Sequence, residues 1–272
     1  MRILVSTGAL IGRPNGRDYR LLSDFRTKLY CDGFEFMMYS DWYDSISDII
    51  QMVRSEGISI PTYHCQKSIG EAISKGGSEN LKDAFDRFGQ NAEMAAKMGA
   101  SKLIMHLWDG FTSDSNFESN LRAYKTLAHI ASECGLDLLV ENVVCNVKDP
   151  MTHLSELRDT YPDIHFVFDT KMAAFHGQLE LLYKEEYAWL FGEGHIRHLH
   201  VNDYGGGYMD WQNLKTLPVG QGKIDFDSFF AYVKKVGYDD TVTLESTAFN
   251  SEGIVDFAML NAEIAAVKKY LQ

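Results

Sequence analysis

The run "RHLHVND" (residues 197–203) places two histidines two positions apart in a stretch typical of a β-strand. Side chains of a strand alternate between its two faces, so His198, His200 and Asn202 are predicted to share one face. Histidine fills an apolar core poorly. The run therefore predicts a strand with one polar face, and the ends of the other strands should show whether that face belongs to a binding site.

Short runs rich in Ile, Val, Leu and Phe alternate along the chain with longer amphipathic segments. Such runs are typical of strands that are covered on both faces. The predicted strands cover residues 2–6, 33–37, 58–64, 102–107, 136–142, 164–169, 196–202 and 241–246. Helices are predicted over 79–98, 225–236 and 254–271, and a glycine suited to ending a helix precedes four of the strands (Gly57, Gly99, Gly135 and Gly237).

Eight β-then-α units without a Ser/Gly-rich linker predict an α/β protein, a single (β/α)8 TIM barrel with one domain over residues 1–272. An open doubly wound sheet is the alternative. It would usually show a glycine-rich phosphate turn after the first strand, and "STGALIGRPNG" (residues 6–16) lacks that spacing.

The composition limits the classes of partner. A formal net charge of −12 disfavours binding to nucleic acid, since such a surface repels phosphate backbones. No apolar stretch reaches the length of a membrane span, and the four cysteines form no CxxC pair, so we expect a reduced cytoplasmic protein without a membrane partner.

The carboxyl ends of the predicted strands carry carboxylates and imidazoles. These are the ends at which a (β/α)8 barrel holds its active site. Seven of the eight strands contribute one such residue each, namely Glu35, His64, His106, Glu141, Asp169, His200 and Glu245. Converging carboxylates repel one another, and a divalent cation would relieve that repulsion.

Glu141, Asp169, His200 and Glu245 are therefore the predicted metal ligands. Three carboxylates and one imidazole suit one divalent ion, with Mn²⁺ preferred and Mg²⁺, Co²⁺ or Zn²⁺ as alternatives. His198 lies two residues deeper in its strand, and we expect it to support His200 or to be a hydrogen-bonded core residue.

Five segments resemble the xylose-isomerase-like barrels, a superfamily that includes sugar-phosphate isomerases and epimerases as well as endonuclease IV. The segments are "VENVV" (140–144), "FDT" (168–170), "HLHVND" (198–203), "PVGQGKIDF" (218–226) and "VTLES" (242–246). The resemblance implies the same four metal ligands, Glu141, Asp169, His200 and Glu245, and it implies a metal-dependent enzyme of carbohydrate metabolism.

The sequence also departs from two branches of this superfamily. Many of its ketose epimerases have Asp-Thr-Gly-His after the sixth strand, where this chain has Asp169, Thr170, Lys171 and Met172. Endonuclease IV resembles the chain at His64, His106 and Glu141, but its third zinc site needs a histidine at 172 and an Asp-x-His motif where "DWQ" (210–212) stands. Cleavage of abasic DNA is therefore not expected, and a second metal between His64 and His106 stays an alternative.

The favoured function is a metal-dependent isomerase or epimerase that acts on a small sugar, keto-sugar or polyol derivative through an enediolate. Glu141, Glu245 and Lys171 are the predicted catalytic residues, and His64, His106, Trp108 and Glu35 the predicted substrate contacts. The alternatives are a lyase or dehydratase of the inosose or dehydroshikimate type and a non-catalytic barrel that binds a sugar or a partner. No phosphate cradle is evident, and a homo-oligomer is possible.

Overall fold

The computed structural model describes all residues from Met1 to Gln272, and its strands close into one parallel barrel in the order β1 to β8. The strands are β1 (Arg2–Ser6), β2 (Gly33–Met37), β3 (Thr62–His64), β4 (Lys102–Met105), β5 (Asp137–Glu141), β6 (His165–Asp169), β7 (Ile196–His200) and β8 (Thr241–Leu244). The register of β1 against β8, with Arg2 opposite Thr241, closes the ring. The predicted single (β/α)8 barrel is confirmed, and the open doubly wound sheet is wrong.

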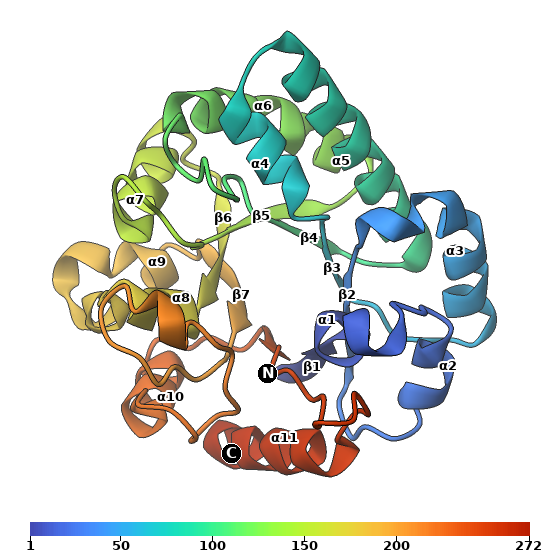
Figure 1. Cartoon of the computed structure of the whole chain (residues 1–272). Helices are drawn as coiled ribbons and strands as arrows, with labels where there is room; N and C mark the ends of the chain where they lie inside the picture. The colour runs from blue at the N-terminus through green and yellow to red at the C-terminus, as the bar shows by residue number, and fades with distance from the viewer.

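A ring of helices surrounds the strands, as Figure 1 shows in a view along the barrel. The helices are α1 (Thr7–Leu10), α2 (Leu21–Phe25), α3 (Ile46–Ser55), α4 (Ser68–Lys75), α5 (Ser78–Met98), α6 (Phe117–Glu133), α7 (Pro150–Thr160), α8 (Thr170–Phe175), α9 (Trp189–Gly192), α10 (Phe226–Lys235) and α11 (Phe257–Leu271). Short 3₁₀ turns are η1 (Arg13–Asn15), η2 (Ser40–Ser45), η3 (Leu179–Tyr183), η4 (Glu185–Tyr187) and η5 (Trp211–Asn213). No helix combines the length and the apolar character that a membrane crossing requires.

The three predicted helices are present with slightly different bounds, as α5, α10 and α11. Helix α11 packs against α2 and so completes the layer of helices around the barrel. The phenyl rings of Phe25 and Phe257 meet edge to face, with 5.1 Å between their centroids. Gly99, which follows α5, has a φ of 86°, a left-handed conformation that favours glycine and ends the helix there.

Several strands are shorter than their sequence patterns predict. The third begins at Thr62 rather than residue 58, because Pro61 has no backbone N–H with which to continue a ladder. Beyond the carboxyl ends of β7 and β8, backbone N–H groups bond to side chains instead of to a neighbouring strand. The Asn202 N–H donates to Thr170 Oγ1 and the Glu245 N–H to Asn202 Oδ1, each at 3.0 Å. The predicted extensions beyond His200 and Leu244 are therefore loop.

The apolar core lies mainly between the sheet and the helices, where 65 buried residues form one cluster. The space inside the barrel holds a separate apolar cluster of only three side chains, Ile104, Leu139 and Val167 on β4, β5 and β6. Buried polar side chains occupy the part of the interior next to β2, β7 and β8, among them Glu35, His198 and Thr243. The barrel interior is thus half apolar and half polar.

Candidate active site

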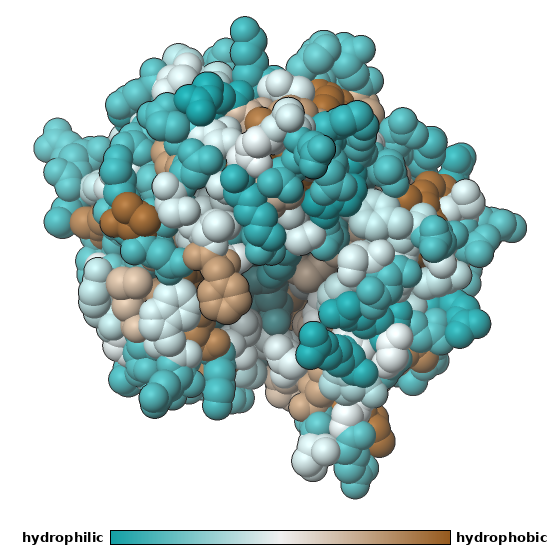
Figure 2. Space-filling view, turned by 45° about the horizontal axis from the view of Figure 1, so that its top comes forward, coloured by the Kyte–Doolittle hydropathy of each residue, from teal (hydrophilic) through white to brown (hydrophobic).

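The barrel brings six of the seven predicted strand-end residues together at one mouth, while Glu35 lies in the middle of β2 and below the mouth. His64, Glu141, Asp169 and His200 are the last residues of β3, β5, β6 and β7, while His106 and Glu245 each lie one residue beyond β4 and β8. Parallel strands end at the same rim of a barrel, which explains the convergence. The face in Figure 2 is mostly hydrophilic and is hollowed near its centre.

The innermost group consists of Glu141, Asp169 and His200, whose potential ligand atoms all lie within 4.8 Å of one another. His200 Nδ1 is 3.4 Å from Glu141 Oε1 and 3.5 Å from Glu245 Oε2. His200 is fully buried, yet its Nδ1 has no hydrogen-bond partner. A buried polar atom without a partner is rare and costly, so this arrangement can accept a cation among oxygen and nitrogen ligands.

The charges of the group shift the pKa values of its members. Burial raises the pKa of Asp169 to about 6, and the neighbouring Glu141 and Glu245 charges act in the same direction. Burial alone would also raise the pKa of Glu141, but the positive charges of His200 and His106 hold it well below its usual range.

The pKa of His200 shifts in the opposite direction. Burial disfavours the charged form of His200, but Glu245, Glu35 and Glu141 raise its pKa well above normal. The carboxylates therefore attract positive charge to the position of His200.

A second group at the mouth contains His64, His106 and Glu141. The Nδ1 atom of His64 lies 2.8 Å from the carbonyl oxygen of Cys65, and that of His106 lies 2.8 Å from Asp109 Oδ2. Both partners are oxygens that accept, so each Nδ1 atom donates its hydrogen to them. The Nε2 atoms of His64 and His106 face Glu141 Oε2, at 3.3 and 3.2 Å respectively. Two imidazoles in this pose can bind substrate hydroxyls or a second cation, and both roles stay predictions.

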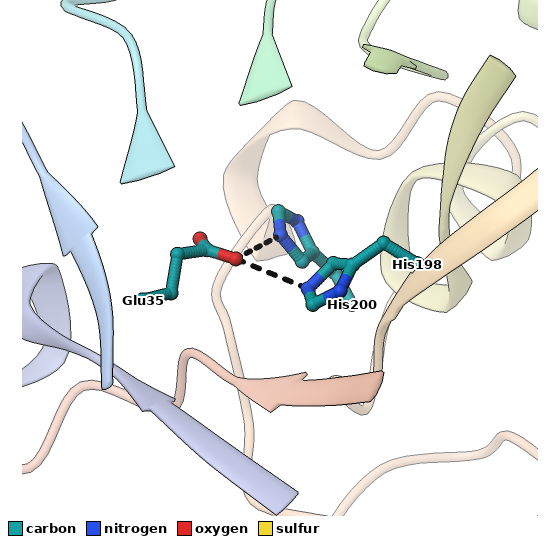
Figure 3. A group of neighbouring side chains, drawn as sticks. All are labelled: Glu35, His198 and His200. Atoms are coloured by element: carbon teal, nitrogen blue, oxygen red, sulfur yellow. Dashed lines mark hydrogen bonds and ion pairs between the residues drawn. The ribbon is translucent and has the colours of Figure 1, made fainter. Parts of the chain in front are cut away.

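Below the mouth, Glu35 lies between the two histidines of the opening sequence run. Its Oε2 atom is 3.1 Å from the Nε2 atoms of both His198 and His200 (Figure 3). Burial lowers the pKa of His198 to about 4, so this ring is neutral near pH 7. Glu35 is fully buried. Its predicted role as a substrate contact is untested, and in this position it contacts His200.

Three further residues form hydrogen bonds around the acidic side chains, to the carboxylates themselves or to the backbone beside them, and none was among the sequence candidates for the site. Asn202 donates to Glu245 Oε2 at 2.9 Å and to Asp169 Oδ2 at 3.2 Å. Asn142 pairs with both the backbone N–H and the carbonyl of Asp169. The position of Asn202 on the face of His198 and His200 was a signal for it. Thr170 had none, since its hydroxyl reaches the carbonyl of Asn202 across a distant part of the chain.

Lys171 and Trp108 lie less openly at the mouth than their predicted roles suggest. Lys171 is 9% exposed, and its ammonium donates to Thr216 Oγ1 at 2.9 Å. Its charge acts on Asp169. Trp108 is fully buried and packs edge-on against Phe117 and His153. Contact between Trp108 and a substrate would require these covering side chains to move, and that contact stays a prediction.

Lys67, which follows β3, is a charged residue of the mouth that sequence patterns did not single out. Its side chain is exposed to solvent. Desolvation by the surrounding atoms would lower the pKa of its ammonium, but the charges of Glu245, Glu141 and Asp109 raise it. Loop aromatics frame the same region. Trp42 and Tyr204 are buried, Trp211 and Tyr208 are exposed, and a cavity of about 460 Å³ lies between Phe111 and Trp211.

Eight parallel strands with carboxylates and imidazoles gathered at their carboxyl ends define a (β/α)8 barrel of the kind whose mouth carries an active site. Residues 28–266 match the family model described as xylose isomerase-like TIM barrel. The chain belongs to this family, which confirms the resemblance seen in the five sequence segments. No curated protein sequence matches the chain significantly.

Solved structures share the fold at low sequence identity. A D-psicose 3-epimerase from Clostridium cellulolyticum H10, solved with D-tagatose, superposes with a TM-score of 0.75, 15% identity and full coverage of both chains. An L-ribulose 3-epimerase gives a TM-score of 0.69 at 18% identity, with 99% of this chain and 94% of that chain covered. A 3-keto-D-glucoside 4-epimerase from E. coli gives 0.65 at 14% identity, with 99% of each chain covered.

Proposed function

We propose that the protein is a divalent-metal-dependent isomerase or epimerase that acts on a small unphosphorylated sugar, keto-sugar or polyol derivative through an enediolate. The observation that carries the proposal is the unpartnered Nδ1 atom of the fully buried His200, faced by Glu141 and Glu245. The names of the structural neighbours, which are sugar epimerases, support the substrate class.

Glu141, Asp169, His200 and Glu245 would hold the ion. Their donor set of three carboxylates and one imidazole fits Mn²⁺ best and also suits Mg²⁺, Co²⁺ or Zn²⁺. When bound, such an ion supplies Lewis-acid stabilisation of negative charge that develops on oxygen. The same carboxylates raise the pKa of His200, so positive charge is favoured at this position and the residues fit the ion chemically.

The chain's own residues move the proton. Glu141 ends β5 and Glu245 directly follows β8. Two strands, β6 and β7, lie between these positions on one side of the barrel and four on the other, so the two carboxylates can flank a substrate. One carboxylate removes a carbon-bound proton, and the other returns a proton to the opposite face for epimerisation or to the neighbouring carbon for isomerisation. Glu245 keeps 14% of its side chain exposed and is therefore open to a ligand entering the mouth.

Polar side chains around these carboxylates would orient the substrate. His64 and His106 each present an Nε2 atom beside Glu141, where a sugar hydroxyl can donate or accept a hydrogen bond. Lys171 brings a positive charge that stabilises the developing enediolate. The ammonium of Lys67, which was not a sequence candidate, adds positive charge at the same mouth.

A lyase or dehydratase acting on a cyclic keto-polyol is the second candidate, and Lys171 is the residue that favours it. Its ammonium can protonate a leaving hydroxyl, and the sequence has Met172 where many ketose epimerases of this superfamily have a histidine. Both reactions begin with the same proton abstraction, so they differ only in the fate of the enediolate.

Incubation with ketoses in D₂O separates the candidates. The panel should include D-psicose, D-tagatose and L-ribulose, the sugars named for the neighbours, and inosose as a lyase substrate. Deuterium at the carbon next to the carbonyl without loss of water is the result expected for an isomerase or epimerase. An unsaturated product would favour the lyase, and retention of every carbon-bound proton in the presence of added Mn²⁺ would contradict both. A cytoplasmic location and a homo-oligomeric state stay predictions.

A further inference from the structure

A column of buried polar side chains runs through the barrel beneath the candidate metal site, and the proposed reaction uses none of it directly. It consists of Lys102, Thr241, His198, Thr243 and Glu35, all at most 8% exposed. Small barrels usually fill this space with branched apolar residues, as Ile104, Leu139 and Val167 do on the other side. Burying polar groups is costly unless they are hydrogen-bonded, and in this column only Glu35 Oε1 lacks a partner, so the arrangement of the bonds is informative.

The direction of the hydrogen bonds is set at the lower end of the column by Lys102, the first residue of β4. An ammonium has three hydrogens and no acceptor. Its Nζ atom donates to the carbonyl oxygen of Arg197 at 2.6 Å, to Asp240 Oδ1 at 2.5 Å and to Thr241 Oγ1 at 2.9 Å. The Thr241 hydroxyl accepts from Lys102, and its one other hydrogen-bond partner is His198 Nδ1, which is where its own hydrogen can be donated.

His198 receives that hydrogen. Its Nδ1 atom lies 2.6 Å from Thr241 Oγ1 and so accepts a hydrogen bond. A neutral imidazole that accepts at Nδ1 carries its hydrogen at Nε2. That Nε2 donates to Thr243 Oγ1 at 2.8 Å, and Glu35 Oε2 lies 3.1 Å from the same nitrogen, so the hydrogen of the ring points toward Thr243 and the Glu35 carboxylate.

Glu35 passes this direction to His200. Its Oε2 atom also accepts from the Thr243 hydroxyl at 3.0 Å and lies 3.1 Å from His200 Nε2, as Figure 3 shows for the two histidines. A carboxylate only accepts, so His200 carries a hydrogen at Nε2 and turns its Nδ1 toward Glu141 and Glu245.

We propose that Lys102, Thr241, His198 and Glu35 are positioning residues that hold His200 in the orientation and tautomer in which Nδ1 is the metal-binding atom. This inference rests on the proposed function, because it gives His200 a cation to bind. It assigns Glu35 to the support of His200 rather than to the substrate. It also links the site to Lys102, whose strand neighbours Thr62 and Asp137 lie below the mouth.

The experiment compares three variants of the full-length protein. Thr241→Val removes the hydroxyl that fixes His198 and keeps the shape of the side chain, while Thr241→Ser keeps the hydroxyl. Thr62→Val is the matched control, because the hydroxyl of Thr62 is buried on β3 of the same barrel and has no hydrogen-bond partner. The readouts are the ¹⁵N resonances of the histidine rings in metal-free protein and the affinity for Mn²⁺ by calorimetry.

Wild type, Thr241→Ser and Thr62→Val should show His198 with its hydrogen at Nε2 and should bind Mn²⁺ alike. In Thr241→Val the His198 ring should become a mixture of tautomers, and the Mn²⁺ affinity should fall about 10–100-fold, the scale for residues that orient a metal ligand. An unchanged tautomer and affinity in Thr241→Val would overturn the inference.

Two further outcomes are distinguishable. If the wild-type protein bound no divalent ion, the proposed function would fail, while the ring resonances of metal-free protein would still test the direction of the column. If Thr241→Val did not fold, Lys102→Met would test the same direction from its origin, since Asp240 keeps 32% of its side chain exposed to water. A normal His198 tautomer in folded Lys102→Met would contradict the role of Lys102.

Discussion

Two of the four buried groups of acidic side chains with histidine or cysteine in this barrel differ in how their hydrogen bonds are satisfied. One is the mouth cluster of Glu141, Asp169 and His200. The other is the loop cluster of Asp114, Cys145 and His153, whose potential ligand atoms also lie within 4.8 Å of one another. By residue type and spacing alone, both could hold a metal ion.

The loop cluster has no lone pair left for a cation at its carboxylate. Asp114 Oδ1 accepts from the backbone N–H groups of Asn146 and Val147, and Oδ2 accepts from the Lys148 N–H at 2.8 Å and from His153 Nε2 at 2.9 Å. In the mouth cluster, His200 Nδ1 is buried without any partner. The loop cluster therefore holds two loops together, whereas the mouth cluster is left open for a ligand.

The difference predicts first that loss of a carboxylate charge lowers proton exchange at the mouth and leaves it unchanged at the loop cluster. Glu141→Gln and Glu245→Gln should each lower solvent-deuterium exchange of a ketose substrate by about 10²–10⁴-fold or more, because an amide cannot act as a base. Glu156→Gln makes the same change beside His153 in the loop cluster and should leave exchange unaltered. Proton NMR in D₂O measures both, and wild-type exchange in Glu141→Gln would contradict the proposed base.

Metal content separates the clusters next. Purified protein should carry close to one divalent ion per chain, and His200→Ala should lose it because one ligand and its hydrogen bond to Glu35 disappear. His153→Ala should retain the ion, since the oxygens of Asp114 stay engaged by three backbone N–H groups. Elemental analysis of the three proteins decides the matter. Full metal retention in His200→Ala, or loss in His153→Ala, would reverse the assignment.

The sequence predicted these two clusters unequally, for a physical reason. The strands of a parallel barrel all end at the same rim. Once the strands were recognised, the sequence therefore predicted that Glu141, Asp169 and His200 lie close together. Asp114 and His153 come from a loop and from α7, and only the packing of those segments makes them neighbours. No periodicity encodes such a contact.

The same reason explains which site details the sequence left out. The pairing of Asn202 with Asp169 and Glu245, and the position of Lys67, depend on side-chain geometry rather than on strand order. The burial of Trp108 and Glu35 likewise depends on which neighbours cover them. Strand ends were overestimated at β4 and β8. At β8 the backbone N–H of Glu245 bonds the side chain of Asn202 rather than a neighbouring strand, and sequence pattern alone does not show where ladder pairing stops.

Lys171 lies beside the mouth cluster, and its replacement should lower turnover without removing the metal. Its ammonium is satisfied by Thr216 but acts on Asp169, so it can stabilise an enediolate or protonate a leaving hydroxyl. Lys171→Met should lower turnover by about 10²-fold and leave the metal content unchanged. Turnover within about twofold of wild type would show that Lys171 is a structural residue, because loss of an acid–base group lowers the rate by about 10²-fold or more.

The smallest predicted effect is a loss of folding stability when the loop cluster is changed, with no effect on metal binding. Asp114→Asn replaces an accepting oxygen by an NH₂ group that faces backbone donors, and should lower the free energy of unfolding by about 1–3 kcal/mol without changing metal content. Asp24→Asn, in an exposed pair with Lys28, is the control and should change it by less than about 1 kcal/mol. Urea midpoints measure both variants.

The pH dependence of that loss has a definite sign. Burial alone would raise the pKa of Asp114, but the N–H donors of Lys148 and His153 lower it to about 2 in the folded state. A carboxyl whose folded pKa lies below its unfolded value stabilises the protein above the unfolded pKa, and that contribution is lost as the pH falls through the folded pKa. The stability difference between wild type and Asp114→Asn should therefore shrink between pH 5 and pH 2. A difference that stayed constant over this interval would mean that the backbone donors, and not the ionised carboxylate, hold the two loops together.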